Sequence, residues 1–218
     1  MSKTLIAPSL LAADFLHLED AARIVNDNAD IFHLDVMDGT FVPNISFGFP
    51  VVEALAKVAR KPMDVHLMIV HPERYVERFA KAGAAMISFH EEAVEADGTD
   101  PAEILKSIRA LGVSPGLVVN PDIPAEKLYP YLELCDFVLI MSVFAGFGGQ
   151  KFIEATYEKV KAVRAEIRRR GLRVKIEVDG GVGADNARAL AKAGADILVA
   201  GSSVFGADDP AAAIAALR

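Results

Sequence analysis

The chain has 218 residues, of which 52% are hydrophobic and 24% are charged. This balance excludes a disordered chain and predicts one soluble domain, 1–218, with a substantial core. The formal net charge of −7 argues against binding to nucleic acid or to an anionic membrane. The apolar stretch near the N-terminus is too short to span a bilayer, so we expect no membrane anchor and a cytoplasmic location. Cys135 is the single cysteine, and its apolar neighbours favour a buried structural thiol.

Short β-branched runs alternate with amphipathic segments along the whole chain. The eight expected strands are Leu5–Leu10, Ile31–Val36, Met63–Met68, Ala85–His90, Gly116–Val119, Phe137–Val143, Arg173–Val178 and Ile197–Ala200. Eight βα units without a break in composition predict a single (β/α)8 TIM barrel. An open doubly wound sheet is the alternative, but it usually has fewer strands and a glycine-rich turn after the first strand. Here Pro8-Ser9 stands at that place.

The strongest functional signal is the run HLDVMDG at residues 33–39, in and after the second expected strand. Successive side chains of a strand point to opposite faces. Leu34 and Val36 should therefore face the helix layer. His33 and Asp35 should face the inside of the barrel, near the mouth formed by the C-terminal ends of the strands.

Two other strands deliver similar side chains to the same mouth. By the same alternation His66 faces inward from the third strand. In the seventh strand Ile176 and Val178 face outward, and Asp179 stands at the C-terminal end, where such barrels place catalytic residues. The converging set is His33, Asp35, His66 and Asp179. Imidazole and carboxylate ligands suit a divalent transition metal, with zinc favoured and iron, manganese and cobalt as alternatives.

Two further polar positions near these strand ends keep open roles. Glu177 should face inward, either as an outer partner of a metal ligand or in a buried ion pair with a group such as Lys175. His90 ends the fourth strand and could approach the site. Glu91 and Glu92, which follow it, favour a solvent-exposed edge instead.

Three turns late in the chain are rich in glycine. They are Gly146-Phe147-Gly148-Gly149-Gln150, Gly180-Gly181 and Gly201-Ser202-Ser203, after the sixth, seventh and eighth expected strands. Glycine lets backbone N–H groups approach an anion closely, and barrels commonly bind phosphate with the loops after strands seven and eight. These turns predict a phosphate site made mainly of neutral backbone donors. They are not a nucleotide-binding P-loop, because the Lys-Ser/Thr ending is missing.

Taken together, these motifs resemble the ribulose-phosphate 3-epimerase family nearly from end to end. The most specific one is HLDVMDGTFVPN at residues 33–44. The others, in chain order, are Ala7-Pro8-Ser9-Leu10, Asp64 to Met68, Met141-Ser142-Val143, Gly146 to Gln150, Glu177 to Gly181 and Gly201-Ser202. The resemblance implies a TIM barrel of the ribulose-phosphate-binding type, a pentulose phosphate as substrate, and a homo-oligomer.

The resemblance also implies individual roles. His33, Asp35, His66 and Asp179 would hold one divalent metal, with Asp35 and Asp179 as the acid–base pair. The residues expected to contact the substrate are Ser9, His66, Gly146, Phe147, Gly148, Gly149, Gly180, Gly181, Gly201 and Ser202. The implied reaction inverts C3 of the sugar and interconverts D-ribulose 5-phosphate and D-xylulose 5-phosphate, within the pentose phosphate pathway.

The chemistry of this reaction accounts for such a site. The proton beside a ketone is weakly acidic, and a metal would stabilise the enediolate as its negative charge develops. Two acids on opposite faces of a planar intermediate suffice to invert the centre, and no organic cofactor is needed. Met37, Met68 and Met141 stand at inward strand ends. They serve either as ordinary core filling or as a polarisable wall that keeps water from the enediolate.

Two departures from the family pattern concern loops. Phe144-Ala145 stands where the family usually has Asn-Pro, and residues 91–101 lack the family's His-rich turn. Either change could alter a loop over the substrate. One alternative function is therefore the same chemistry on a hexulose phosphate such as allulose 6-phosphate. A metal-independent lyase or decarboxylase would be expected to use a Lys near the carboxylates, and none follows Asp35 in its motif. A non-catalytic sugar-phosphate sensor would not need two acids.

Overall fold

Eight parallel strands form one sheet that curls into a nearly closed barrel in the computed structural model, which describes residues 4–95 and 98–218. The strands are β1 (Leu5–Pro8), β2 (Phe32–Met37), β3 (Met63–Met68), β4 (Met86–His90), β5 (Ser114–Val119), β6 (Phe137–Met141), β7 (Lys175–Asp179) and β8 (Ile197–Ala200). Their order in the sheet is β1-β8-β7-β6-β5-β4-β3-β2. The first and last strands of this order approach each other through a parallel bridge between Ser9 and His33 and a hydrogen bond from Ile31 N to Ile6 O. The expected TIM barrel is therefore confirmed.

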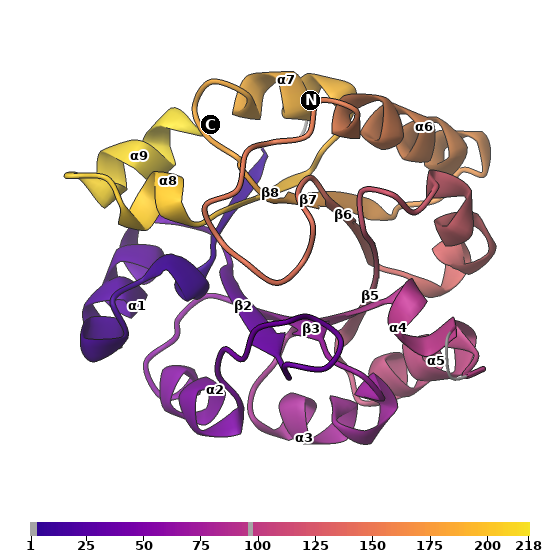
Figure 1. The fold of residues 1–218 in the computed structure, drawn as a ribbon, viewed down its shortest axis with the longest axis horizontal. Helices are drawn as coiled ribbons and strands as arrows, with labels where there is room; N and C mark the ends of the chain where they lie inside the picture. Colours follow the sequence, from indigo (N-terminus) through magenta and orange to yellow (C-terminus); the bar gives the residue numbers. More distant parts are fainter. Residues whose placement is uncertain (1–3, 96–97) are drawn as a thin grey trace.

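Helices surround this ring of strands on the outside (Figure 1). They are α1 (Leu18–Asn28), α2 (Phe49–Ala56), α3 (Val76–Lys81), α4 (Glu91–Glu95), α5 (Pro101–Ala110), α6 (Thr156–Arg169), α7 (Ala187–Ala193), α8 (Ser202–Phe205) and α9 (Pro210–Ala216), together with 3₁₀ helices Leu10–Ala12, Phe15–His17, Pro72–Arg74 and Ala125–Leu134. Within the described residues no helix combines the length and the apolar character needed to cross a membrane.

The alternation expected from the strand sequences holds in the barrel. Leu34 and Val36 of β2 and Ile176 and Val178 of β7 belong to the large apolar cluster that includes residues of the surrounding helices. His33, at 0% exposure, lies on the opposite, inward face of β2. The outward face therefore supplies the packing energy of the barrel, while the inward face is available for chemistry.

The ends of several strands differ from the expectation by one or two residues. β1 ends at Pro8 because Ser9 instead caps a 3₁₀ helix, where its hydroxyl oxygen accepts a hydrogen bond from Leu11 N at 3.3 Å. β5 begins earlier, at Ser114, because Pro115 still takes part in the sheet: its carbonyl accepts from Asp136 N at 2.9 Å. These shifts leave every metal-ligand candidate on the face that alternation assigned to it.

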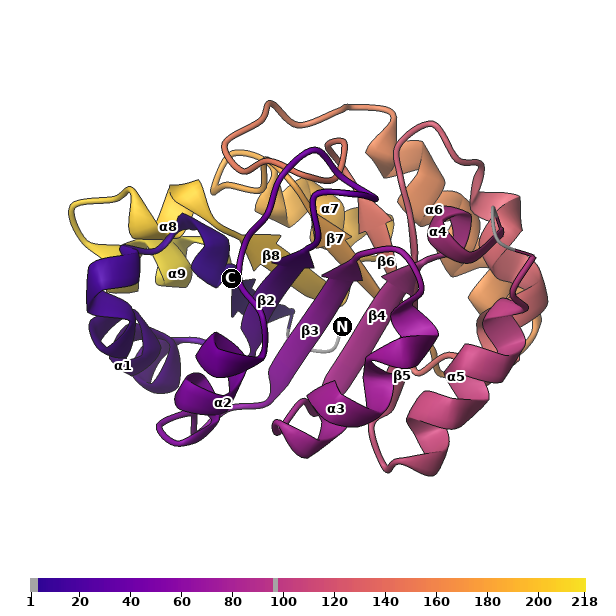
Figure 2. The same ribbon diagram turned by 60° about the horizontal axis from the view of Figure 1, so that its bottom comes forward.

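All the catalytic candidates lie at one end of the barrel. In the side view the strands run toward the upper loops, and the loops after β2 and β6 lie together at that end (Figure 2). Asn44, in the loop after β2, joins the two loops through a hydrogen bond from its side-chain amide to Gly146 O at 2.9 Å. The mouth is thus formed by backbone loops that close over the inward strand faces.

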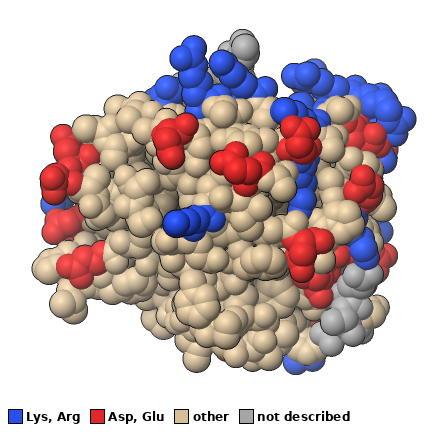
Figure 3. All heavy atoms as spheres, turned by 45° about the horizontal axis from the view of Figure 1, so that its top comes forward, with Lys and Arg blue, Asp and Glu red and all other residues tan. Residues whose placement is uncertain are grey.

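On the face shown in Figure 3, Asp and Glu are dispersed while most Lys and Arg gather along the upper edge.

Phe137 and Gly116 form a tight contact on neighbouring strands. They are paired in the β5–β6 register, and a Cβ atom at Gly116 would lie 2.3 Å from Cζ of the Phe137 ring. Gly116→Ala should therefore force a buried ring to move and should lower the free energy of unfolding by about 1–3 kcal/mol. Urea denaturation measures this change.

The matched control is Gly148→Ala, because a Cβ at Gly148 meets no atom within 4 Å. It should leave the unfolding midpoint close to that of the parent chain. Equal midpoints for the two variants would contradict the close packing of Phe137 over Gly116.

Candidate metal centre and active site

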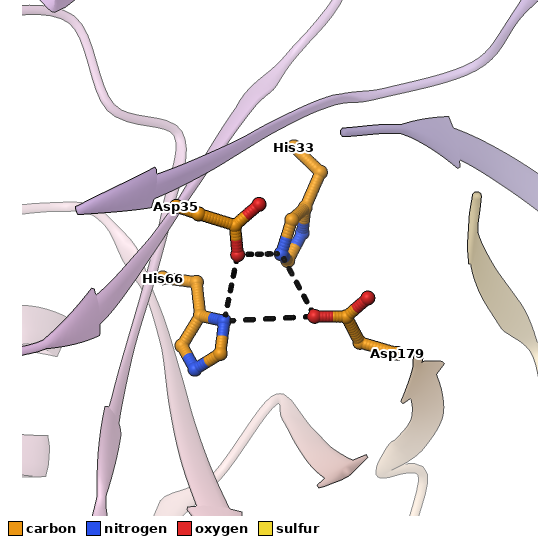
Figure 4. A group of neighbouring side chains, drawn as sticks. All are labelled: His33, Asp35, His66 and Asp179. Carbon is orange, nitrogen blue, oxygen red and sulfur yellow. Dashed lines mark hydrogen bonds and ion pairs between the residues drawn. The ribbon is translucent and has the colours of Figure 1, made fainter. Parts of the chain in front are cut away.

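Four side chains from three strands meet inside the mouth of the barrel (Figure 4). Each offers one ligand atom, and these atoms all lie within 4.8 Å of one another; the set is His33, Asp35, His66 and Asp179. Asp35 Oδ1 lies 3.3 Å from both His33 Nε2 and His66 Nδ1. Asp179 Oδ2 lies 3.8 Å from His33 Nε2 and 3.9 Å from His66 Nδ1. The structure therefore brings together all four metal-ligand candidates that the sequence indicated.

These separations fit a divalent metal between the four groups. Ligand atoms about 2.0–2.2 Å from a tetrahedral ion are themselves about 3.3–3.6 Å apart, close to the separations between these four groups. His33 Nε2 is buried and has no partner with hydrogen-bond geometry among the described residues, so its ring nitrogen remains free for a metal. One buried and one partly buried carboxylate beside two imidazoles also match the donor set of transition-metal sites. The residues present thus fit the implied cation.

Beneath this cluster, Asp64 holds the far side of the His33 ring. Asp64 Oδ2 lies 2.7 Å from His33 Nδ1, and both side chains are fully buried. A carboxylate at this position accepts the N–H of Nδ1, which leaves Nε2 as the nitrogen that faces the cluster. Glu177 Oε1 lies 3.6 Å from His33 Nδ1, the nitrogen that Asp64 also contacts. Lys175, the other candidate partner of Glu177, is exposed at the start of β7. Of the two roles open for Glu177, this geometry favours an outer partner of a ligand.

The buried charges of the site shift one another's pKa values in opposite directions. Burial, followed by the charge of Asp35, raises the pKa of Asp179 to about 7. Burial works against ionisation of Asp35 as well, but His33 and His66 outweigh it and lower the pKa of Asp35. Burial, with the charge of Asp64, raises the pKa of Glu177 to about 8. The two aspartates of the cluster therefore differ in how firmly each holds a proton.

The position of His90 differs from the solvent-exposed edge that its acidic neighbours favoured. Its side chain is fully buried, and its Nε2 lies 2.9 Å from Nε2 of His66. The reason is tertiary: β4 lies next to β3 in the barrel, and the ring of Phe41, from the loop after β2, packs on His90 with centroids 4.8 Å apart. The residues around His90 in the chain do not indicate this contact, although the alternation of β4 could have placed His90 inward.

Hydrogen bonds from two serines that are distant in sequence hold the two aspartates in place. The Ser9 hydroxyl donates to Asp35 Oδ2, so that Oδ1 of this carboxylate is the oxygen turned to the cluster. At β7, the backbone carbonyl of Asp179 accepts from Ser142 N at 2.7 Å and from Ser142 Oγ at 2.8 Å. Ser9 and Ser142 therefore explain why the Ala-Pro-Ser-Leu and Met-Ser-Val motifs accompany the metal-ligand candidates.

A pocket opens above the cluster and collects the remaining site candidates. Its lining includes Asp35 and Asp179 on one side and the three glycine-rich turns on the other. The expected substrate contacts that line it are Ser9, Gly146, Phe147, Gly148, Gly149, Gly180, Gly181, Gly201 and Ser202, and the three methionines Met37, Met68 and Met141 line it too. His66 lies below this lining, within the metal cluster. One pocket thus joins the metal centre to the turns expected to bind phosphate.

Glycine is required by geometry at the turn after β7. Gly180 has φ +118°, and a Cβ there would lie 2.8 Å from Val143 N; at Gly181, with φ +61°, it would lie 2.6 Å from Phe152 N. Larger residues would push the loop after β6 away from the end of β7. The backbone of the turn is therefore held at the pocket wall without a side chain in front of it.

Of the two departures from the family pattern, one lies at the pocket. Phe144 and Ala145 line it, with Phe144 51% exposed. The segment 91–101 begins with α4, whose Glu92 reaches Asn120 N at 3.0 Å; residues 96–97 lie outside the described part of the chain. Cys135, by contrast, is remote from the mouth and buried, and burial raises the pKa of its thiol to about 12, as expected for a structural cysteine.

Comparisons with known proteins agree with this geometry. The profile of the Ribulose-phosphate 3 epimerase family matches residues 5–205. The chain is 50% identical to the ribulose-phosphate 3-epimerase of Mycobacterium tuberculosis over 98% of this chain and 91% of that protein. It is 44% identical to the cytoplasmic isoform from Oryza sativa over 98% of this chain and 92% of the relative. The crystal structure of KGPDC from Streptococcus mutans superposes with a TM-score of 0.73 over 98% of this chain and 95% of that one, and at 16% identity it shows the shared fold alone.

If the four-residue cluster binds a divalent ion, that ion should stabilise the folded chain. After removal of metal with a chelator, Zn²⁺ at about 100 times its dissociation constant should add about 2.7 kcal/mol to the free energy of unfolding. Thermal unfolding with and without Zn²⁺ measures the rise. His66→Ala should abolish it, whereas His17→Ala, at an exposed position, should retain it. An unfolding midpoint of the parent chain that does not respond to any divalent metal would rule out the centre.

Proposed function

The chain belongs to the ribulose-phosphate 3-epimerase family and is an epimerase of the pentose phosphate pathway, and from this premise we propose how its own residues act. It interconverts D-ribulose 5-phosphate and D-xylulose 5-phosphate by inverting C3. His33, Asp35, His66 and Asp179 hold one divalent metal, with zinc favoured and iron, manganese or cobalt as alternatives.

The observation that carries the proposal is the placement of two carboxylates around one centre. Asp35 and Asp179 occupy opposite corners of the four-residue cluster, separated by the two imidazoles (Figure 4). They come from β2 and β7, and both line the pocket into which the glycine-rich turns project. A sugar held there by its phosphate would have one carboxylate on each side of its reacting carbon.

Proton transfer by these two carboxylates inverts the centre. When bound, a divalent cation supplies positive charge that stabilises the negative charge developing on the substrate. Asp35 takes the proton from one face of C3, and Asp179 returns a proton to the other face; in the reverse direction the two exchange roles.

The remaining pocket residues orient the sugar and exclude water. Backbone N–H groups of the turns at residues 146–149, 180–181 and 201–202 hold the phosphate, far from the reacting carbon. Ser9 lines the pocket and contacts the sugar, whereas His66, the other expected contact, lies below the lining within the metal-ligand cluster. Met37, Met68 and Met141 form an apolar wall beside the enediolate, where a low dielectric strengthens the electrostatic interactions. Binding the phosphate restricts the sugar to poses in which C3 lies between the two acids.

Two further proposals concern the location and the assembly of the enzyme. We propose that it works in the cytoplasm, as the name of the rice isoform states for that protein. We also propose a homo-oligomer. Large apolar side chains are exposed on its surface, among them Leu16 at 89% and Ile45 at 75%, and association of subunits would cover such surface. Light scattering of the purified chain measures the oligomeric state.

Asp35→Asn and Asp179→Asn should each lower kcat by about 10²–10⁴-fold, because an amide cannot transfer the proton. A ribulose 5-phosphate epimerisation assay measures the loss, and the metal content of each variant separates loss of the acid from loss of the ion. Asp27→Asn, at an exposed position on α1, is the matched control and should keep the parent rate. Substantial turnover by either site variant would remove that residue from the acid–base pair.

The sugar selectivity is tested separately, because Phe144 and Ala145 lie at the pocket wall. Ribulose 5-phosphate and allulose 6-phosphate carry the same reacting group but differ by one carbon in length. The chain should turn over the pentulose with the larger kcat/KM when both are assayed under the same conditions. Markedly faster turnover of the hexulose would show that this loop has redirected the enzyme to a six-carbon substrate.

A further inference from the structure

A chain of polar contacts leads away from the metal centre behind His66. Nε2 of His66 lies 2.9 Å from Nε2 of His90, and the angle between the two ring planes is 22°. On the other side of its ring, His90 Nδ1 lies 3.3 Å from Oε1 of Glu92. Both imidazoles are fully buried, and the Glu92 side chain is 18% exposed. The ring centroids are 5.0 Å apart, so the two nitrogens, 2.9 Å apart, lie between the rings, and the N–H of one can point to the other.

One arrangement of protons satisfies the contacts from His66 through His90 to Glu92. A metal ligand must present a lone pair, so Nδ1 of His66, which faces the cluster, carries no proton, and its Nε2 carries the N–H. Nε2 of His90 must then accept, which leaves the N–H of His90 on Nδ1. That N–H points to Glu92, whose carboxylate can only accept. In this arrangement the tautomer of His66 depends on the carboxylate of Glu92, which lies outside the cluster and acts through His90.

Glu92 is itself held firmly. Its Oε1 accepts hydrogen bonds from Asn120 N at 3.0 Å and Asn120 Nδ2 at 2.7 Å. Burial would raise the pKa of Glu92, but the hydrogen bonds from His90 and Asn120 prevail and lower it, so the carboxylate stays charged. Asn120 Oδ1 in turn accepts from Ala145 N at 3.0 Å, in the loop that lines the pocket. The contacts therefore run without a break from the metal centre to the loop after β6.

We propose that His90 and Glu92 are positioning residues for the metal ligand His66. They fix the tautomer and the direction of its ring through the relay His66–His90–Glu92. His33 is held directly by Asp64 at 2.7 Å, so each imidazole of the centre has a carboxylate behind it, one in contact and one through a second imidazole. Neither His90 nor Glu92 lines the pocket, and they act through His66 alone. The inference rests on the proposed role of His66 as a metal ligand.

The test measures metal binding as well as turnover. The purified chain is stripped of metal and reloaded with Co²⁺, whose visible absorption reports the geometry of its ligands, and the dissociation constant is measured by competition with a chelator of known affinity. His90→Phe keeps the size of the ring but removes the acceptor, and Glu92→Leu removes the terminal carboxylate. Each should weaken Co²⁺ binding by about 10–100-fold, change the absorption spectrum, and lower kcat more than it raises KM for the pentulose phosphate.

Conservative variants separate positioning from packing. In His90→Gln the side-chain oxygen can accept from His66 while the amide N–H donates to Glu92, so this variant should regain most of the affinity and the parent spectrum. Glu103→Gln, on the exposed face of α5, is the matched control for the loss of a carboxylate and should match the parent chain. Circular dichroism of the metal-free proteins identifies any variant that does not fold. If His90→Phe does not fold, the test is the comparison of Glu92→Leu with Glu92→Gln, which keeps an acceptor oxygen and should bind Co²⁺ more tightly than Glu92→Leu.

The outcomes distinguish this inference from the function on which it rests. If the parent chain binds no Co²⁺ and has no activity, the proposed metal-dependent epimerisation fails. If the parent chain binds Co²⁺ and turns over its substrate, but folded His90→Phe and Glu92→Leu keep its affinity and spectrum, only the positioning role is overturned. A fall in the thermal stability of the metal-free variants with an unchanged Co²⁺ spectrum also overturns it, because His90 and Glu92 would then act in packing alone.

Discussion

Two carboxylates and two imidazoles share one small space inside the barrel mouth, where His33, Asp35 and His66 are almost completely removed from water. Ionised groups in such a place are unfavourable unless each charge meets an opposite charge or a hydrogen bond. A divalent cation answers that requirement for the four groups at once. Such a cation would contact one atom of each group. The second polar atoms of Asp35, His33 and His66 have hydrogen-bond partners in Ser9, Asp64 and His90, respectively.

The parallel barrel makes this concentration of polar groups compatible with a stable fold. Outward side chains of the strands join an apolar cluster with the helices, and that cluster needs no contribution from the inward residues near the mouth. Strand alternation therefore separates packing from chemistry within single strands. In β2 the two functions alternate residue by residue, since Leu34 packs against the helices while His33 and Asp35 on either side of it face the metal centre.

Loops complete what the strands begin. The loop after β2 crosses to the loop after β6 through Asn44 and covers His90 with Phe41. The loop after β6 also rests on the turn at Gly180 and Gly181, which leaves no room for side chains. The pocket wall is thus joined through these contacts to the buried cluster below it. The proposed epimerisation depends on that joint placement of the glycine-rich turns, the two carboxylates and the two imidazoles.

Sequence alone determined the barrel and most of the centre, because both depend on local periodicity. Alternation placed His33, Asp35, His66 and Asp179 inward, and glycine turns marked the pocket wall. Only the tertiary structure decided the place of His90, which local charge favoured as an exposed edge. Its burial follows from Phe41, in the loop after β2, and its link through Glu92 to Asn120 from the pairing of β4 with β5. Such contacts join residues distant along the chain, and no periodic pattern within a single strand encodes them.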